Sequence, residues 1–120
     1  MATENSSPTS TGWTCDHIGA PALDDSPGVL VKDARAGLVG YEMHNASAAD
    51  AFVQFFNADA LADVNLGTTV ADYVVPILAN DVKSAYFPTA INFDDGIVVF
   101  STTAHNGSSA AIVDVWLAVV

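Results

Sequence analysis

Cys15 and His17 are the first residues in the chain whose types and spacing could do chemistry. A thiol two residues from an imidazole could supply a nucleophile with its base, or half of a zinc site. Zinc needs four ligands at recognisable spacing, and the sequence holds no second cysteine. A nucleophile needs an orienting third group and an oxyanion hole, and this pair lies in a segment without periodic pattern. We therefore predict no catalytic or metal-binding role here.

Two aspartate pairs, Asp24–Asp25 and Asp94–Asp95, could offer hard oxygen ligands to calcium. Neither pair fits the spaced loop Asp-x-Asp-x-Asp-Gly, and adjacent side chains of an extended chain point in opposite directions. One pair therefore cannot chelate an ion as a unit. Turn chemistry accounts for both pairs, and Asp94-Asp95-Gly96 is a tight-turn signal. We predict turns and no metal at Asp24, Asp25, Asp94 and Asp95, with a bound ion as the alternative.

The remaining histidines, His44 and His105, could join Asp50 or Asp114 in a Ser–His–Asp arrangement. The sequence has no Gly-x-Ser-x-Gly elbow to present the serine. We expect the histidines not to converge, and we predict a protein that is not an enzyme and needs no cofactor.

Two further kinds of residue could mark a surface. Asn5, Asn45 and Asn106 each begin a glycosylation sequon, and we interpret the three as turn sequences because we expect no secretion signal in this chain. Trp116 falls on the face of the last strand opposite its valines. It could belong to a second core face, anchor a contact between subunits, or form an aromatic platform for a sugar. We favour core or contact.

These residues must be positioned by strands, since turn residues break the chain into short β-branched runs. In the last run Val113, Val115, Leu117 and Val119 alternate with more polar residues, so we expect this strand to lie inside a sheet. The expected strands are Val29–Lys32, Gly37–Asn45, Ala51–Asn57, Val70–Leu78, Val82–Phe87, Ala90–Phe93, Ile97–Thr103 and Ala111–Val120.

About eight strands at this spacing predict an all-β fold, a single antiparallel sandwich of jelly-roll type over residues 28–120. Within Gly37–Asn45, alternation places Val39, Tyr41 and Met43 on one face. Pro76 favours an edge strand or a bulge. Asp59–Thr68 is the least strand-like part, where we expect a loop with one helical turn.

Composition narrows the classes of partner. Of 120 residues, 51% are hydrophobic and 14% charged, and the net charge is −11 at pH 7. Such a surface repels phosphate, so we expect no nucleic-acid partner. The longest apolar run near the end, Val115–Val120, is far shorter than the roughly 20 residues of a membrane span, so we expect none. Twelve of the fourteen acids are Asp, which suits a high-salt medium; an ordinary acidic protein is the alternative.

Residues 1–27 differ from the rest of the chain. Met1–Gly12 is rich in Ser and Thr, and Pro21 and Pro27 interrupt the segment after it. We expect an extended N-terminal arm with too little apolar surface to order itself. We infer that this arm lies against a neighbouring subunit.

From Arg35 to Val120 the sequence resembles the small β-sandwich virion proteins of tailed viruses. The similar stretches are, in order, RAGLVGYEMHNASAADAFVQFFNA, ADYVVPILAN, FPTAINFDDGIVVFSTTA and AIVDVWLAVV. The long arm and the extreme acidity depart from that pattern and suggest a virus of a salt-loving host. The resemblance implies a structural virion role, as a homotrimer on the capsid exterior.

We accordingly expect a capsid decoration protein that binds the outside of a shell and reinforces contacts between major capsid subunits, with its arm reaching its neighbours. The alternatives are a capsid vertex or turret part, a tail part, or a receptor-binding module that recognises carbohydrate.

Overall fold

The computed structural model describes residues 4–8, 14–19, 28–105, 107 and 111–120, and for the first two ranges the backbone alone. Over these residues the fold is all-β, with one short 3-10 turn, η1 (Leu61–Asp63). The strands are β1 (Glu4–Pro8), β2 (Thr14–Gly19), β3 (Val29–Lys32), β4 (Ala36–Asn45), β5 (Ala51–Asn57), β6 (Tyr73–Ile77), β7 (Asp81–Phe93), β8 (Ile97–Thr102) and β9 (Asp114–Val119). No helix in these ranges has the length and apolarity that crossing a membrane requires.

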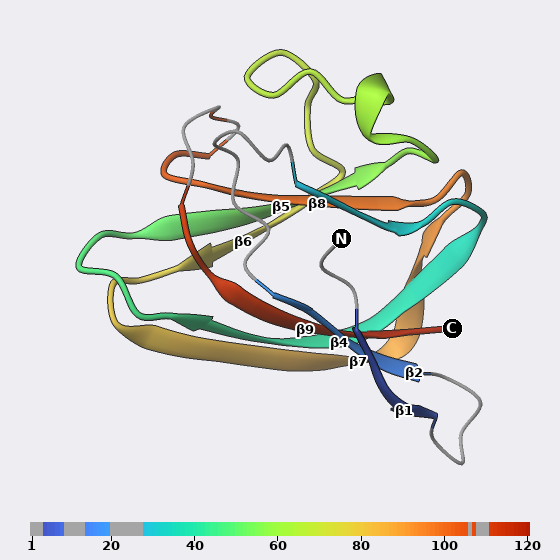
Figure 1. The fold of residues 1–120 in the computed structure, drawn as a ribbon, viewed down its shortest axis with the longest axis horizontal. Coiled ribbons are helices and arrows are strands. Elements are labelled where there is room, and N and C mark those ends of the chain that lie inside the picture. Colours follow the sequence, from blue (N-terminus) through green and yellow to red (C-terminus); the bar gives the residue numbers. More distant parts are fainter. Residues whose placement is uncertain (1–3, 9–13, 20–27, 106, 108–110) are drawn as a thin grey trace.

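The strands form two antiparallel sheets that pack face to face (Figure 1). Sheet A has the order β1-β2-β9-β4-β7, and sheet B has the order β3-β8-β5-β6. Strand β2 pairs with β9, β3 with β8, β4 with β7 and β5 with β6. Nested pairs of this kind, divided between two four-stranded sheets, define a jelly roll, with β1 added outside β2. The predicted fold class is confirmed.

Strand β9 lies in the middle of sheet A, between β2 and β4, as predicted for the last strand. The alternating residues Val113, Val115, Leu117 and Val119 are at most 1% exposed and face sheet B across the core. Fully burying such a side chain is worth about 1.5–3 kcal/mol, so this strand contributes strongly to the stability of the sandwich.

One face assignment in β4 was wrong. The register with β7 and β9 shifts between Leu38 and Gly40, so Val39 occupies a bulge. A bulge adds one residue and reverses the alternation on one side of it. Leu38, rather than Val39, therefore joins Tyr41 and Met43 in the core.

The two strands expected on either side of Pro88 are one bent strand, β7. Across the bulge in β4, the paired residue of β7 changes from Ile91 to Tyr86, so the β7 residues between these two are looped out of the ladder. Proline is tolerated there because β7 is an edge strand and no neighbour needs the missing N–H.

Strand β6 is the edge of sheet B, which confirms the expectation from Pro76. Lys83 on β7 donates a hydrogen bond from Nζ to the carbonyl oxygen of Pro76, at 3.1 Å. The lysine thus links the edges of the two sheets, and a lysine on an edge strand is a common protection against edge-to-edge pairing.

The long connection between β5 and β6 contains η1, in agreement with the loop and helical turn expected over Asp59–Thr68. Figure 1 shows this connection lying over β5 and β8, on the side of sheet B away from sheet A. It packs partly buried apolar residues on a second buried cluster. That cluster consists of Phe56, Ala58, Val98 and Phe100, and the residues from the connection are Leu61, Val64, Leu66 and Ala71.

The described parts of the N-terminal arm are extended, but they pair within their own chain. Strand β1 pairs with β2, and β2 pairs with β9 over Thr14–Gly19. The structure is of one chain, so contact of the arm with a neighbouring subunit stays a prediction. Sequence periodicity did not reveal β1 and β2 because polar residues such as Ser, Thr and Asp can form a ladder through their backbones alone.

Candidate functional site

The residues considered for chemistry do not come together in the described part of the chain. The backbones of Cys15 and His17 lie on β2, in register with Ala118 and Trp116 of β9, and their side chains are outside the described atoms. Asp24 and Asp25 lie outside the described residues altogether.

The two described histidines belong to different sheets. His44 is exposed on β4, directly across the ladder from Asp114. His105 follows β8 of sheet B, where its ring meets the ring of Phe52 edge-on at 6.2 Å. Asp50 lies in a loop, where one of its carboxylate oxygens accepts a hydrogen bond from the N–H of Ala79 at 3.0 Å. The geometry places neither of these imidazoles between a nucleophile and a carboxylate.

Asp94 and Asp95 lie in the turn between β7 and β8, as predicted. Asp94 forms an exposed ion pair with Arg35, at 3.8 Å between nitrogen and oxygen. The side-chain oxygen of Asn57 accepts the backbone N–H groups of Asp95 at 2.8 Å and of Gly96 at 3.4 Å. Hydrogen bonds to the side-chain amide of Asn57 thus hold the turn in place.

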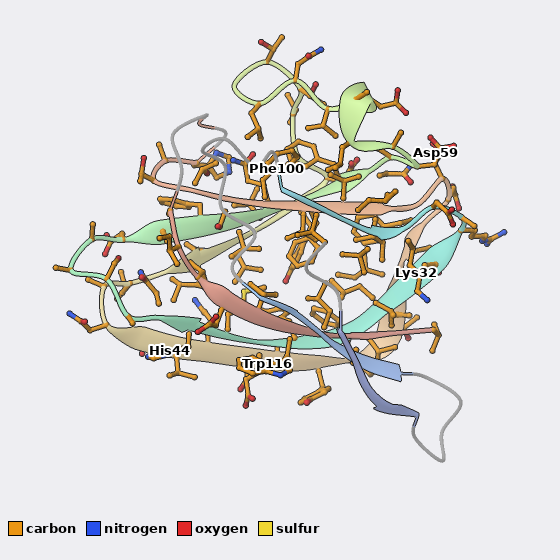
Figure 2. All side chains as sticks on the ribbon, in the orientation of Figure 1. Lys32, His44, Asp59, Phe100 and Trp116 are labelled. Carbon is orange, nitrogen blue, oxygen red and sulfur yellow. The ribbon has the colours of Figure 1, made fainter. Side chains whose placement is uncertain are left out.

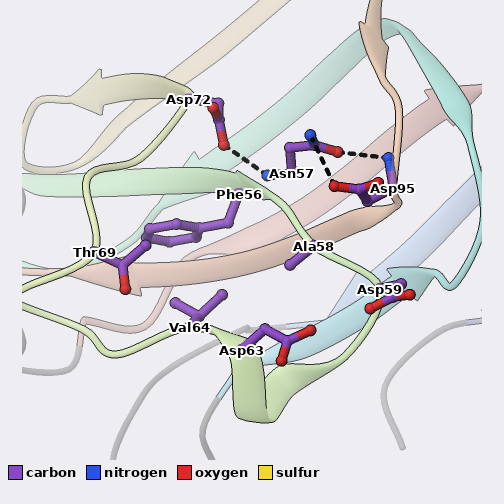
Figure 3. Close-up of a pocket in the computed structure, with 9 residues that line it drawn as sticks. All are labelled: Phe56, Asn57, Ala58, Asp59, Asp63, Val64, Thr69, Asp72 and Asp95. Atoms are coloured by element: carbon purple, nitrogen blue, oxygen red, sulfur yellow. Dashed lines mark hydrogen bonds between the residues drawn. The ribbon is translucent and has the colours of Figure 1, made fainter.

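An acidic hollow of about 220 Å³ lies beside this turn (Figure 3). Its carboxylates come from Asp59, Asp63, Asp72 and Asp95. Asp72 accepts the N–H of Asn57 at 2.7 Å, and Asp95 accepts from the Asn57 side chain at 3.4 Å. In the ranges that the structure describes, no group of three or more His, Cys, Asp or Glu side chains is arranged to hold a metal ion.

Asn45 shows why its sequon is a turn sequence. Its side chain is fully buried at the end of β4. The amide nitrogen donates to the carbonyl oxygens of Ala49 at 2.9 Å, Leu78 at 3.2 Å and Ile77 at 3.3 Å. The amide oxygen accepts the N–H of Ser47 at 3.1 Å. A side chain held in this way is inaccessible to glycosylation in the folded protein.

Trp116 lies on the outer side of sheet A, pointing away from sheet B like His44 (Figure 2). The registers of β9, β4 and β7 arrange nine outward positions in three rows, which we call the open face. The rows are Asp114–His44–Val82, Trp116–Glu42–Ser84 and Ala118–Gly40–Tyr86. No connection in the described ranges crosses them, so this face is the best candidate for a functional surface.

The aromatic residues of the open face rest on its small ones. Tyr86 is 65% exposed, yet its ring lies against Gly40, where a methyl group would come within 2.4 Å of Tyr86 Cδ1. A shallow hollow of about 60 Å³ opens beside this ring, lined by Tyr41, Glu42, Tyr86, Trp116 and Ala118. Glycine at position 40 therefore fixes where the tyrosine ring can lie.

Tyr41 lies beneath the open face, within an aromatic row that joins the two sheets. Its ring is 6.0 Å from Phe87, which is 6.1 Å from Tyr73 of sheet B. Burial, together with a side-chain hydrogen bond to Tyr73, raises the pKa of Tyr41 to about 12. Below that pH the hydroxyl stays protonated and ties β4 to β6.

Sequence reasoning identified Trp116 but missed Tyr86, Glu42 and Gly40. Each is unremarkable in its own stretch of sequence. The signal that would have found them is the pairing of β4 with both β7 and β9, which sets the three in neighbouring rows with Trp116.

Comparison of the chain with family models, with curated proteins and with solved structures finds no match. The fold and the open face therefore have to be interpreted from their own chemistry.

Proposed function

We propose that this protein is a structural virion component, a capsid decoration protein that acts as a homotrimer on the outside of a shell and reinforces contacts between major capsid subunits. The jelly-roll topology supports this role by analogy, since the same arrangement builds many capsid and lectin domains. The proposed role requires no catalysis and no cofactor.

The observation that carries the proposal is the β1–β2 hairpin at the edge of sheet A. It is attached by main-chain pairing with β9, and its sequence is polar. The positions in register with the buried Leu117 and Val119 are Asp16 and Thr14. A hairpin whose sequence holds so few apolar residues gains little from packing on its own body. It can instead add its strand to the same edge of a neighbour.

The charge of the chain favours the same location. A net charge of −11 keeps the protein away from the packaged genome, so the capsid exterior is the favourable side. Screening at high salt would lower the repulsion between copies, in keeping with a salt-loving host.

A reversible lock tests the role of the hairpin. Cys15 and Ala118 are register partners, and directly opposed residues of an antiparallel pair lie about 4.5–5.5 Å apart between Cα atoms, within disulfide range. In Ala118→Cys, oxidation should join β2 to β9 of the same chain and prevent exchange. We expect the oxidised protein to load poorly onto capsid particles assembled without it, and the reduced protein to load normally.

The control is Cys15→Ser combined with Ala118→Cys, which leaves one thiol and cannot form the lock. It should load equally well under oxidising and reducing conditions. Normal loading of the oxidised Ala118→Cys protein would show that the hairpin is not needed by a neighbour. The number of copies per particle then separates the alternatives: hundreds indicate decoration, whereas a handful indicates a vertex or tail part.

A further inference from the structure

The open face of sheet A has the chemistry of a docking surface for a cationic group. Its central row holds Glu42 beside Trp116, with Tyr86 in the next row. Glu42 is exposed, and it is one of only two glutamates in the chain. A carboxylate with one aromatic residue beside it and another in the next row combines the two groups that attract an organic cation.

The size of the hollow decides between a small molecule and a side chain as the occupant. Its volume is about 60 Å³. Pockets for small molecules span about 300–1,000 Å³, several times this volume. A sugar ring would lie outside such a hollow, but the planar end of one side chain can enter it.

The charges of the face exclude two other partners. If a second copy docked through the same face, the carboxylates of Glu42 and Asp114 in the two copies would lie close together and repel one another. Each copy also carries a net charge of −11. A wholly apolar surface would bury Glu42 without a partner, at a cost that its contacts would not offset. The occupant must therefore bring positive charge and hydrogen-bond donors.

We propose that the open face docks an arginine-bearing protein surface, with a guanidinium entering the hollow against Tyr86 and Trp116 and pairing with Glu42. A guanidinium suits this site better than an ammonium, because it is planar, stacks on aromatic rings and donates two parallel hydrogen bonds to one carboxylate. This inference rests on the proposed function, because that function supplies the partner protein toward which the open face would turn.

The test uses the full-length protein with Trp13→Phe, which leaves Trp116 as the single tryptophan reporter. The probes are the peptides acetyl-Gly-Arg-Gly-Arg-Gly-amide, its lysine counterpart and its glutamine counterpart, and methyl glycosides of glucose, galactose and mannose. Binding is followed by Trp116 fluorescence at low salt. We expect the arginine peptide to bind more tightly than the lysine peptide, and the glutamine peptide and the glycosides to give no saturable change.

Variants then distinguish binding at the open face from attraction to the overall negative charge of the protein. Glu42→Gln should weaken binding of the arginine peptide about two- to fivefold, and combining it with Tyr86→Ala should weaken binding about tenfold. The matched control is Asp63→Asn, which removes the same charge from an exposed residue of the connection over sheet B. That control should bind like the parent.

Equal weakening by Glu42→Gln and Asp63→Asn would overturn the proposal, because binding would then follow net charge alone. Saturable binding of a glycoside that is lost in Tyr86→Ala would also overturn it, in favour of a sugar site. The assay contains no capsid, so its failure leaves the role of the hairpin standing. Normal loading of the disulfide-locked protein would likewise leave the open face standing.

Discussion

The two sheets of this sandwich have unlike outer faces. On sheet B, Phe56 and Phe100 point outward, meet edge-on at 5.8 Å and are at most 2% exposed. The connection between β5 and β6 covers them with its own apolar residues. On sheet A the corresponding outward positions hold Glu42, His44 and Asp114, all exposed.

The difference separates stability from recognition. A sheet buried on both sides needs apolar residues at successive positions, as in Ile97–Phe100 of β8, where every residue is at most 2% exposed. A sheet with one free side alternates between buried and more exposed residues, as β9 and the residue before it do from Val113 to Leu117. Sheet B therefore contributes a second small core, and sheet A keeps a surface that binding can use.

Truncating one aromatic residue on each outer face should give the largest difference in the free energy of unfolding between the two sheets. Phe100→Ala should lower the free energy of unfolding by about 3–5 kcal/mol, because it leaves a cavity beneath the covering connection. Tyr86→Ala should cost at most about 1 kcal/mol, because that ring is 65% exposed. Urea unfolding of both variants measures the difference. Equal losses would mean that the open face is as much a part of the core as the covered one.

A second test concerns the connections that hold the two sheets in place relative to one another. Asn45 leads from β4 to β5, is fully buried and bonds to carbonyls beside β6. Asn45→Ala should cost about 2–3 kcal/mol, because buried carbonyl groups lose their donor. Asn57, which holds the turn from β7 to β8, is half-buried, and Asn57→Ala should cost about 1 kcal/mol.

Thermal unfolding of the two asparagine variants provides the measurement. Ser47→Ala is the matched control, because it removes the sequon and one bond to Asn45 while leaving the buried amide nitrogen paired. A cost for Ser47→Ala as large as that for Asn45→Ala would contradict the role assigned to the buried amide.

Much of the fold was predictable because local patterns determine it. The bounds of β3 and β5 agree with those expected from sequence, and so do the buried alternation of β9 and the edge position of Pro76. Turn residues and β-branched runs act over a few residues, so one sequence suffices to find them. The jelly-roll arrangement followed from the number and spacing of these strands.

The rest could not be predicted because it depends on residues far apart in sequence. The bulge at Val39 reverses which residues face the core, and nothing in its own strand marks it. The hairpin of β1 and β2 is held by backbone pairing with β9, which composition does not report. The open face exists only through the register of three strands, so Trp116 was found without Tyr86 and Glu42 beside it.

A final prediction tests how dry the floor of the open face is. Tyr41 lines the hollow from the core side, and its pKa of about 12 lies above the ordinary tyrosine value of about 10. Because the folded state holds this proton more tightly than the unfolded state, the associated stability is present below about pH 10. It is lost as pH rises toward 12.

Tyr41→Phe should abolish this loss, measured by urea unfolding across that range. If Tyr41 ionised near pH 10 in the absorbance of tyrosinate, water would reach its hydroxyl, and the open face would be a deeper site than its shallow hollow implies.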